Sequence, residues 1–195
     1  MAEISRRTIV AEALNLLNEV GLDEVSLRRL ASRLGVKAPS LYWYVEDKAA
    51  LLGLMSETVF QSCLDRVPPC DSWQSWLRAF GLSLFSAQNE VRDCARLIMI
   101  ASVPAERVVE VNDTIVGHLA RFGLDRDLAS RMQASVQMMI TGWSACRAAP
   151  FGPWLDKIMV VNEAASEALD TLIAGWEVRL LSETSPLPTS TAANY

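Results

Sequence analysis

The chain has 195 residues, which is enough for one small domain joined to a modest second one, or for one continuous domain. Hydrophobic residues make up 51% of it, and 18 Lys and Arg against 23 Asp and Glu give a formal net charge of -5. This acidic balance argues against a protein that binds nucleic acid over its whole surface. It leaves room for a local basic patch, because salt screens charges beyond about 8–10 Å.

The sequence offers little for a metal site or a membrane span. Its four cysteines are scattered without a Cys-x-x-Cys pair and there is one histidine, so we expect buried free thiols in a reducing compartment and no metal or other cofactor. No apolar run approaches the roughly 20 residues that span a bilayer, and the run from Met1 to Arg7 has no apolar leader. The sequence predicts a cytoplasmic protein that does not contact a membrane.

Two helices are predicted at the start of the chain. The first runs from about Ser5, a suitable N-cap, to Val20, and Gly21 can take the left-handed conformation that ends a helix. The second begins at Ser26, again an N-cap, and stops at Gly35. Its shared apolar face is formed by Leu27, Leu30, Ala31 and Leu34.

A third, very short helix is predicted at about Pro39–Tyr44, because proline is favoured at the first helical position. Tyr42, Trp43 and Tyr44 are consecutive, and a helix cannot bury three consecutive residues on one stripe. We therefore expect at least one or two of these rings to face outward. The alternative is that they belong to the core of a small helical bundle.

Asp47 is expected to cap a fourth helix that extends to about Arg66, before a break that contains Pro68 and Pro69. Helical periodicity recurs beyond it, whereas strand signals are almost absent. Further helices are predicted at Ser72–Gln88, Val91–Ala101, Ala105–Arg121, Asp125–Ala148 and Trp154–Leu181. The sequence thus predicts an all-α fold of about nine helices, with a three-helix domain over residues 1–47, a helical domain over 48–182 and a disordered tail over 183–195.

Two helices joined by a tight glycine-containing turn are typical of a helix-turn-helix, whose second helix enters the major groove of DNA. The segment 26–48 carries five basic and two acidic residues, so it is locally positive in an acidic chain. The residues around the third helix include a cation, small apolar groups, a hydroxyl and aromatic rings. The small apolar groups suit contacts with thymine methyls, and the polar tips of the aromatic rings can reach phosphates. The pattern predicts a protein that binds double-stranded DNA.

The run from Ser26 to Leu52, with the sequence SLRRLASRLGVKAPSLYWYVEDKAALL, resembles the DNA-binding domain of the tetracycline-repressor (TetR) family. Within that family, the run Leu41-Tyr42-Trp43-x-Val45 is closer to the tetracycline repressors than to most members. The resemblance covers about the first third of the chain. It implies a homodimeric transcriptional repressor, not an enzyme, that leaves a palindromic operator when a small ligand binds.

The resemblance also assigns roles in DNA binding. Arg28 matches a base-reading arginine, and Trp43 and Lys48 match phosphate contacts. Ala38 replaces a base-reading glutamine and Tyr44 replaces a histidine, so we expect a different operator. The predicted DNA-binding residues, which include matches to contacts with base methyls and the backbone, are Ser26, Arg28, Lys37, Ala38, Pro39, Ser40, Tyr42, Trp43, Tyr44 and Lys48.

The last two long helices carry apolar stripes. The resemblance implies that they pair with their counterparts across a twofold axis as a four-helix bundle, which would present two DNA-reading helices one DNA turn apart. The alternative is that the stripes complete the core of a single chain. The stripe residues are Leu128, Met132, Val136, Met139 and Ile140, then Ile158, Val161, Ala165, Leu169, Leu172 and Ile173.

Family members bind an effector inside the helical body. An aromatic and methionine lining would suit a flat, apolar ligand, and the alternative for each such residue is plain core. Sensing of a tetracycline–magnesium complex is not expected, because one histidine cannot fill two histidine roles and Leu64 stands about where the drug-contacting one aligns. The predicted lining is Phe60, Leu64, Trp76, Phe80, Phe85, Met99, His118, Met138 and Trp143.

Two other functions stay open on the sequence alone: a small helical enzyme, and a ligand-binding or interaction protein of the same fold that does not bind an operator. The enzyme has no support from a Ser-His-Asp set, a Gly-rich phosphate loop or a metal cluster. The presence of Arg28, Lys37 and Lys48 counts against the interaction protein.

Overall fold

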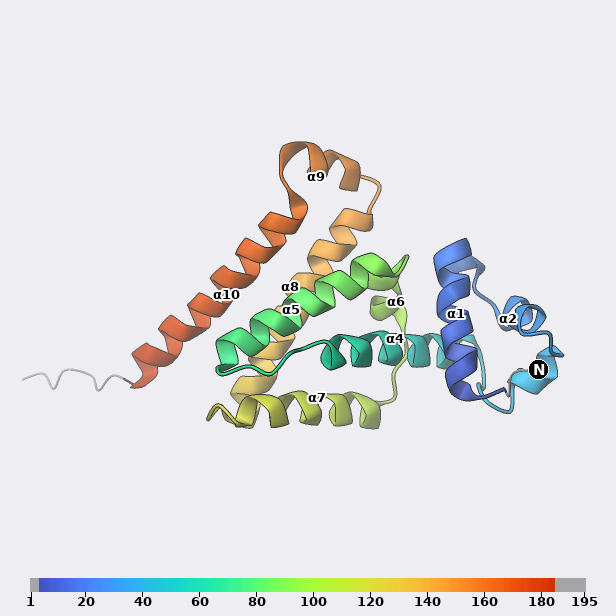
Figure 1. Cartoon of the computed structure of the whole chain (residues 1–195), viewed down its shortest axis with the longest axis horizontal. Coiled ribbons are helices and arrows are strands. Elements are labelled where there is room, and N and C mark those ends of the chain that lie inside the picture. The colour runs from blue at the N-terminus through green and yellow to red at the C-terminus, as the bar shows by residue number, and fades with distance from the viewer. Residues whose placement is uncertain (1–3, 185–195) are drawn as a thin grey trace, which may run out of the picture.

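The computed structural model describes residues 4–184, and every regular element in this range is helical (Figure 1). The N-terminal part contains α1 (Arg6–Val20), the short 3-10 helix η1 (Leu22–Glu24), α2 (Leu27–Arg33) and α3 (Ala38–Leu41). The body contains α4 (Lys48–Asp65), α5 (Trp73–Glu90), α6 (Cys94–Ile100), α7 (Ala105–Ala120), α8 (Arg126–Ala148), α9 (Gly152–Ile158) and α10 (Val161–Thr184). The all-α prediction is confirmed, with ten α-helices in the described range instead of about nine.

Helices α1 and α4 begin at the N-cap residues that the sequence predicts. The Ser5 hydroxyl accepts a hydrogen bond from the Thr8 N–H at 3.1 Å, and the Asp47 carboxylate accepts one from the Ala50 N–H at 2.7 Å. Gly21 ends α1 with φ 82°, a conformation that glycine adopts without steric cost. These local signals explain why the predicted starts of α1 and α4 lie within one residue of the observed ones.

The N-terminal helices share one hydrophobic core with the first half of α4. Leu17, Leu30 and Leu41 are fully buried in it, together with Leu51 of α4 and Leu97 of α6. Because these side chains come from both parts of the molecule, the N-terminal domain is joined to the body by packed contacts as well as by the chain.

In the body, α5 packs against both α8 and α10 (Figure 1). Gly81 of α5 lies at a close approach, because a Cβ there would lie 2.7 Å from Leu169 of α10 and 3.1 Å from Val136 of α8. The body core therefore depends on side chains that the last long helices direct toward α5.

Most of the predicted stripe residues are consequently buried inside the protomer, which supports the alternative that the stripes complete the core of a single chain. Pairing of the two helices with a second copy stays a prediction. Leu128, Met132, Val136, Ile140, Val161, Ala165, Leu169 and Ile173 are all buried. The large apolar side chains that stay exposed on α8 and α10 are Met138, Val178 and Leu181.

The helix predicted over Trp154–Leu181 is two helices. Met159 follows α9 in an extended conformation (φ -155°, ψ 157°), and α10 starts at Val161. The apolar periodicity continues across this break, so the sequence alone predicted one helix. The α8–α9–α10 turn projects from one end of the body (Figure 1). Of the tail predicted over residues 183–195, α10 includes the first two, and 185–195 lie outside the described residues.

Polar contacts join the start of α6 to the N-terminal helices. The Asp93 carboxylate accepts a hydrogen bond from the Leu22 N–H at 2.9 Å. The Arg96 guanidinium donates to both carboxylate oxygens of Asp23, at 2.6 and 2.9 Å, and this pairing lowers the pKa of Asp23. The same end of α6 is also tied through Arg92 to Asn18 and Glu19.

The other end of α6 is followed by a segment that touches α4. A Cβ on Gly53 of α4 would lie 2.6 Å from the carbonyl oxygen of Ser102, so only glycine fits without displacement. The contact is between two backbones. It connects the helix that leaves the N-terminal domain with residues 101–104.

Candidate DNA-binding surface and body cavity

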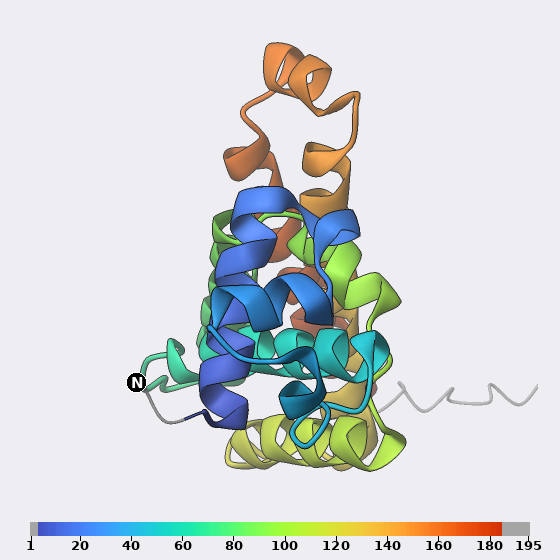
Figure 2. The same cartoon turned by 90° about the vertical axis from the view of Figure 1, so that its right-hand side faces the viewer.

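The α2–α3 pair forms a helix-turn-helix. Gly35 takes φ 67° in the turn, and the Val36 N–H donates to the Ala31 carbonyl at 3.0 Å. Pro39 lies in the first turn of α3, and Leu41 is fully buried beneath it. Leu41 therefore fixes the helix to the core while its neighbours face outward. Figure 2 views the molecule from the side of these N-terminal helices.

The aromatic run after α3 is largely exposed. Trp43 is 88% exposed and Tyr42 is 57% exposed, whereas Tyr44 is half-buried. The Tyr44 carbonyl accepts a hydrogen bond from Arg6 Nε at 3.2 Å, which ties this run to the start of α1. The expectation that at least one or two rings face outward is confirmed, and the alternative that all three are core is excluded.

The three arginines of α2 differ in their partners. Arg29 pairs with Glu24 at 2.5 Å. Arg33 pairs with Glu12 and Glu19 of α1, and these hydrogen bonds lower the pKa of both carboxyls. Arg28 is exposed and forms no ion pair or hydrogen bond with a described residue. It is therefore the α2 arginine whose guanidinium is available to a ligand.

The remaining predicted DNA-binding residues surround these groups. The Ser26 hydroxyl caps α2 by accepting from the Arg29 N–H at 3.3 Å, so its own hydrogen is left to donate. Lys48 is exposed in the first turn of α4, where the positive end of the helix dipole adds to its charge. The other positions around α3 are exposed at Lys37 and Pro39 and half-buried at Ala38 and Ser40.

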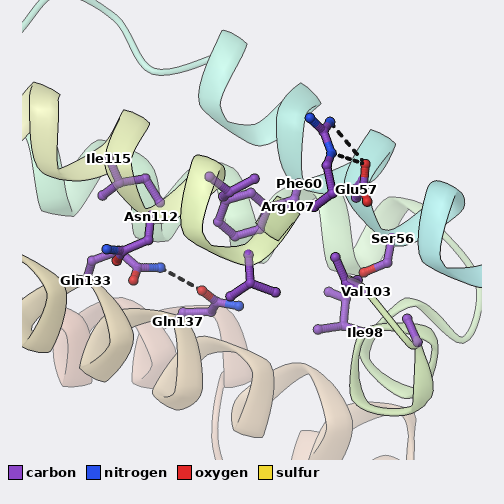
Figure 3. Close-up of a pocket in the computed structure, with 13 residues that line it drawn as sticks. Ser56, Glu57, Phe60, Ile98, Val103, Arg107, Asn112, Ile115, Gln133 and Gln137 are labelled. Atoms are coloured by element: carbon purple, nitrogen blue, oxygen red, sulfur yellow. Dashed lines mark hydrogen bonds and ion pairs between the residues drawn. The ribbon is translucent and has the colours of Figure 1, made fainter. Parts of the chain in front are cut away.

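The body contains a cavity of about 350 Å³ between α4, α6, α7 and α8 (Figure 3). Apolar groups form much of its wall, and three carboxamides lie on one side. It is lined by Ser56, Glu57, Phe60, Ile98, Ala101, Val103, Arg107, Val108, Val111, Asn112, Ile115, Gln133 and Gln137. Its volume falls within the range of small-molecule sites.

Of the predicted lining residues, only Phe60 borders this cavity. Leu64, Trp76 and His118 line a separate pocket of about 290 Å³ beside Pro68 and Cys70. The others border neither. Phe80 and Phe85 are core, Trp143 is half-buried, and Met99 and Met138 are 71% and 63% exposed.

A row of stacked rings joins the two pockets. Phe60 meets Phe80 edge-on with centroids 5.8 Å apart, Phe80 stacks on Trp76 at 5.4 Å, and Trp76 stacks on His118 at 5.6 Å. The aromatic residues that the sequence suggested as ligand contacts thus pack mainly against one another.

The polar lining differs from the aromatic and methionine lining that the sequence predicts. Gln133 and Gln137 lie one turn apart on α8, and Gln133 is only 6% exposed. An amide in an otherwise apolar stretch was the signal that could have found the cavity, because a buried amide needs hydrogen-bond partners.

The surroundings of His118 favour its neutral form. Burial lowers its pKa, and the charge of Arg121 lowers it further. Arg121 Nη2 lies 2.8 Å from His118 Nδ1. Since a guanidinium only donates, Nδ1 accepts, and the proton of the neutral ring lies on Nε2.

The four thiols differ in their exposure. Burial raises the pKa of Cys63 to about 11 and that of Cys94 to about 12, whereas Cys146 is exposed, so burial of all four thiols is not observed. Residues 4–184 contain no group of three or more His, Cys, Asp or Glu side chains placed to hold a metal ion. No helix in that range is both long and apolar enough to span a membrane.

Comparisons with known proteins agree with this architecture. The family described as "Bacterial regulatory proteins, tetR family" matches residues 9–55. The tetracycline repressor protein class D of Escherichia coli is 35% identical over 116 residues, which cover 58% of this chain and 53% of that protein. The chain thus aligns with about half the length of this relative.

Solved structures match over nearly the whole chain. A TetR variant from Acinetobacter baumannii AYE in complex with minocycline has 31% identity and a TM-score of 0.77, over 91% of this chain and 98% of that one. A TetR-family transcriptional regulator from Streptomyces coelicolor has 32% identity and a TM-score of 0.61, over 91% and 99%. These relatives are transcriptional regulators, not enzymes. The chain belongs to the TetR family of bacterial regulatory proteins.

Proposed function

We propose that this chain is a cytoplasmic transcriptional repressor that binds a palindromic operator as a homodimer and leaves it when a small molecule enters the 350 Å³ cavity. We assign DNA binding to residues 1–47 and effector binding and dimerisation to residues 48–182. The observation that carries the proposal is the exposure of Tyr42 and Trp43 next to the buried Leu41, together with an exposed Arg28 on α2 that has no ion pair or hydrogen bond to a described residue.

The ten predicted DNA-binding residues would fall into groups that contact bases and groups that contact phosphates. Arg28 would read a guanine through O6 and N7, and the groups around α3 would touch base methyls and the sugar–phosphate backbone. Trp43 and Lys48 would bind phosphates without reading sequence. The two arginines already paired to carboxylates would contribute less, because a DNA phosphate would have to displace their partners.

Dimerisation would bring two α3 helices to one duplex. The large apolar side chains exposed on α8 and α10 are Met138, Val178 and Leu181. Burying them against a second copy would remove apolar surface from water, which favours association. Binding two half-sites at once raises affinity, since the second contact is intramolecular.

The cavity supports ligand control of DNA binding. Its lining includes residues of α4, which continues from the DNA-binding domain, and of α6, which is bonded to that domain through Asp93 and Arg96. A ligand that favours one arrangement of these helices would change the spacing of the two α3 helices. The relative solved in complex with minocycline supports a small molecule as the ligand.

The test is selection of genomic fragments by the purified full chain, followed by affinity measurements on the selected and a scrambled duplex across salt concentrations. We expect a palindrome whose half-sites are about one DNA turn apart, with affinity that falls as salt rises. Absence of both an enriched sequence and salt-dependent binding would overturn the proposal in favour of an interaction protein. Turnover of candidate ligands would indicate an enzyme.

A further inference from the structure

The carboxamides of Asn112, Gln133 and Gln137 form a polar row along one side of the cavity (Figure 3). Gln133 Nε2 donates to Gln137 Oε1 at 2.6 Å, and Asn112 Nδ2 donates to Ser130 Oγ at 3.2 Å. These two hydrogen bonds hold the carboxamides in place but use only some of their donors and acceptors. The amide nitrogen of Gln137 and the amide oxygens of Asn112 and Gln133 form no hydrogen bond with a described residue.

The rest of the wall is mainly hydrocarbon. Phe60 from α4, Ile98 from α6, and Val108, Val111 and Ile115 from α7 line the cavity. An occupant would therefore have apolar faces and a polar edge, with both donors and acceptors available to it from the carboxamides.

Among the described residues that line the cavity, the charged ones are Arg107 and Glu57, which form an ion pair. Arg107 Nε and Nη2 lie 3.3 and 3.2 Å from a carboxylate oxygen of Glu57, whose side chain is 17% exposed, and Arg107 also pairs with Glu110. An anionic ligand would have to displace two carboxylates from Arg107. The described residues that line the cavity include no histidine, cysteine or aspartate.

We propose that the cavity takes an uncharged organic molecule with apolar faces whose carbonyl or hydroxyl oxygens lie along one edge, where Asn112, Gln133 and Gln137 bind them. This inference rests on the proposed regulator and names the chemical class of its effector. It replaces the flat, largely apolar ligand that an aromatic and methionine lining would suit, because the carboxamides would lose hydrogen bonds with water on contact with a hydrocarbon.

The test uses three tricyclic probes of nearly equal shape: xanthone, which carries a ring carbonyl, xanthene, which lacks it, and xanthone-2-carboxylate, which is charged. Binding to the full-length protein is measured without DNA, by calorimetry or by quenching of tryptophan fluorescence. We expect xanthone to bind about tenfold more tightly than xanthene, since one net hydrogen bond is worth about that factor, and also more tightly than the carboxylate.

Variants connect this preference to the amides. Gln137→Leu, and the nearly isosteric Gln137→Glu, which cannot donate to a carbonyl when ionised, should bring the xanthone-to-xanthene ratio close to one. Gln61→Leu is the matched control, because Gln61 is exposed on α4, bonds Asp65 and does not line the cavity. Circular dichroism confirms that each variant is folded.

The outcomes separate this inference from the proposed function. Equal or tighter binding of xanthene, preference for the carboxylate, no saturable binding of xanthone, or an unchanged ratio in both Gln137 variants overturns the inference, even if the protein binds an operator. A protein that shows the expected preference but enriches no DNA sequence keeps this ligand class and loses its assignment as a repressor.

Discussion

The carboxylate of Asp93 accepts a hydrogen bond from the backbone N–H of Leu22 at 2.9 Å, across 71 residues of sequence. Asp93 precedes α6 and takes a left-handed conformation with φ 54°, the one described non-glycine residue with positive φ. This bond, with the Arg96–Asp23 ion pair, attaches the DNA-binding domain to the helix that borders the cavity. Under the proposed function, α6 would link occupation of the cavity to the orientation of the DNA-binding domain.

Removal of this bond should destabilise the protein. Asp93→Ala leaves the Leu22 N–H without its partner and puts an alanine at positive φ, so we expect a loss of about 1–3 kcal/mol in the free energy of unfolding. Asp93→Asn keeps an acceptor and a side chain that tolerates this conformation, so its loss should be well below that of alanine. Urea unfolding of both variants measures the difference, and equal losses would contradict the role assigned to the bond.

DNA specificity should depend on the one described α2 arginine that has no acidic partner. Arg28→Ala is expected to lower discrimination at one base pair of each half-site by about 1–3 kcal/mol. The matched control is Arg29→Ala, which removes an arginine already paired to Glu24 and should leave discrimination unchanged. Binding titrations on the operator and on single-base variants provide the measurement. Equal loss on cognate and scrambled DNA for Arg28→Ala would rule out base reading by this residue.

Lys48 should contribute affinity without specificity. Lys48→Ala is expected to weaken binding to all sequences alike and to reduce the slope of log affinity against log salt by about 0.9 for each phosphate that is no longer neutralised. The check is the salt dependence of binding to cognate and scrambled duplexes. Weakening confined to the cognate operator would show that Lys48 reads sequence instead.

Leu41 and Trp43 are two residues apart and should respond oppositely to truncation. Leu41 is fully buried, so Leu41→Ala should cost about 2–5 kcal/mol of stability. Trp43→Ala removes a side chain that is 88% exposed, so stability should change by less than about 0.5 kcal/mol while operator affinity falls about tenfold. Thermal unfolding and DNA titration of both variants test this, and a strongly destabilised Trp43→Ala protein would place the ring in the core.

The stability of the protein should fall in mild acid because of its single histidine. The pKa of His118 lies below its usual value of 6.5 in the folded protein, so the unfolded chain binds the proton more readily. The stabilisation from neutral His118 is complete above pH 6.5 and is lost as the pH falls through its folded pKa. The melting temperature of the His118→Gln variant should vary less over this window than that of the original chain. Identical pH profiles would mean that His118 is not perturbed.

Local signals made the first third of the fold predictable. Helices begin after the N-cap side chains of Ser5, Ser26 and Asp47, and α1 ends at Gly21, as the sequence predicts. Three consecutive aromatic residues likewise could not all be buried on one face of a helix. These effects involve neighbours within a few residues. A single sequence therefore determines them well.

The body was less predictable, because burial there depends on partners distant in sequence. Phe80 and Met99 are both apolar residues on predicted helices, yet one is fully buried and the other is largely exposed, according to which neighbour each helix meets. The cavity and its carboxamides depend on how α4, α7 and α8 converge, which periodicity does not specify. Periodicity also does not mark the break at Met159, because apolar residues recur at helical spacing on both sides of it.

The close approach of Gly53 and the Ser102 carbonyl has a mechanical consequence. Side chains that touch can change rotamer and so absorb a small displacement, whereas two backbones pressed together have no such freedom. A ligand that shifts Val103, which lines the cavity, would move the adjoining Ser102 carbonyl against Gly53. Because this junction is stiff, most of the displacement would reach α4, the helix that leads to the DNA-binding domain.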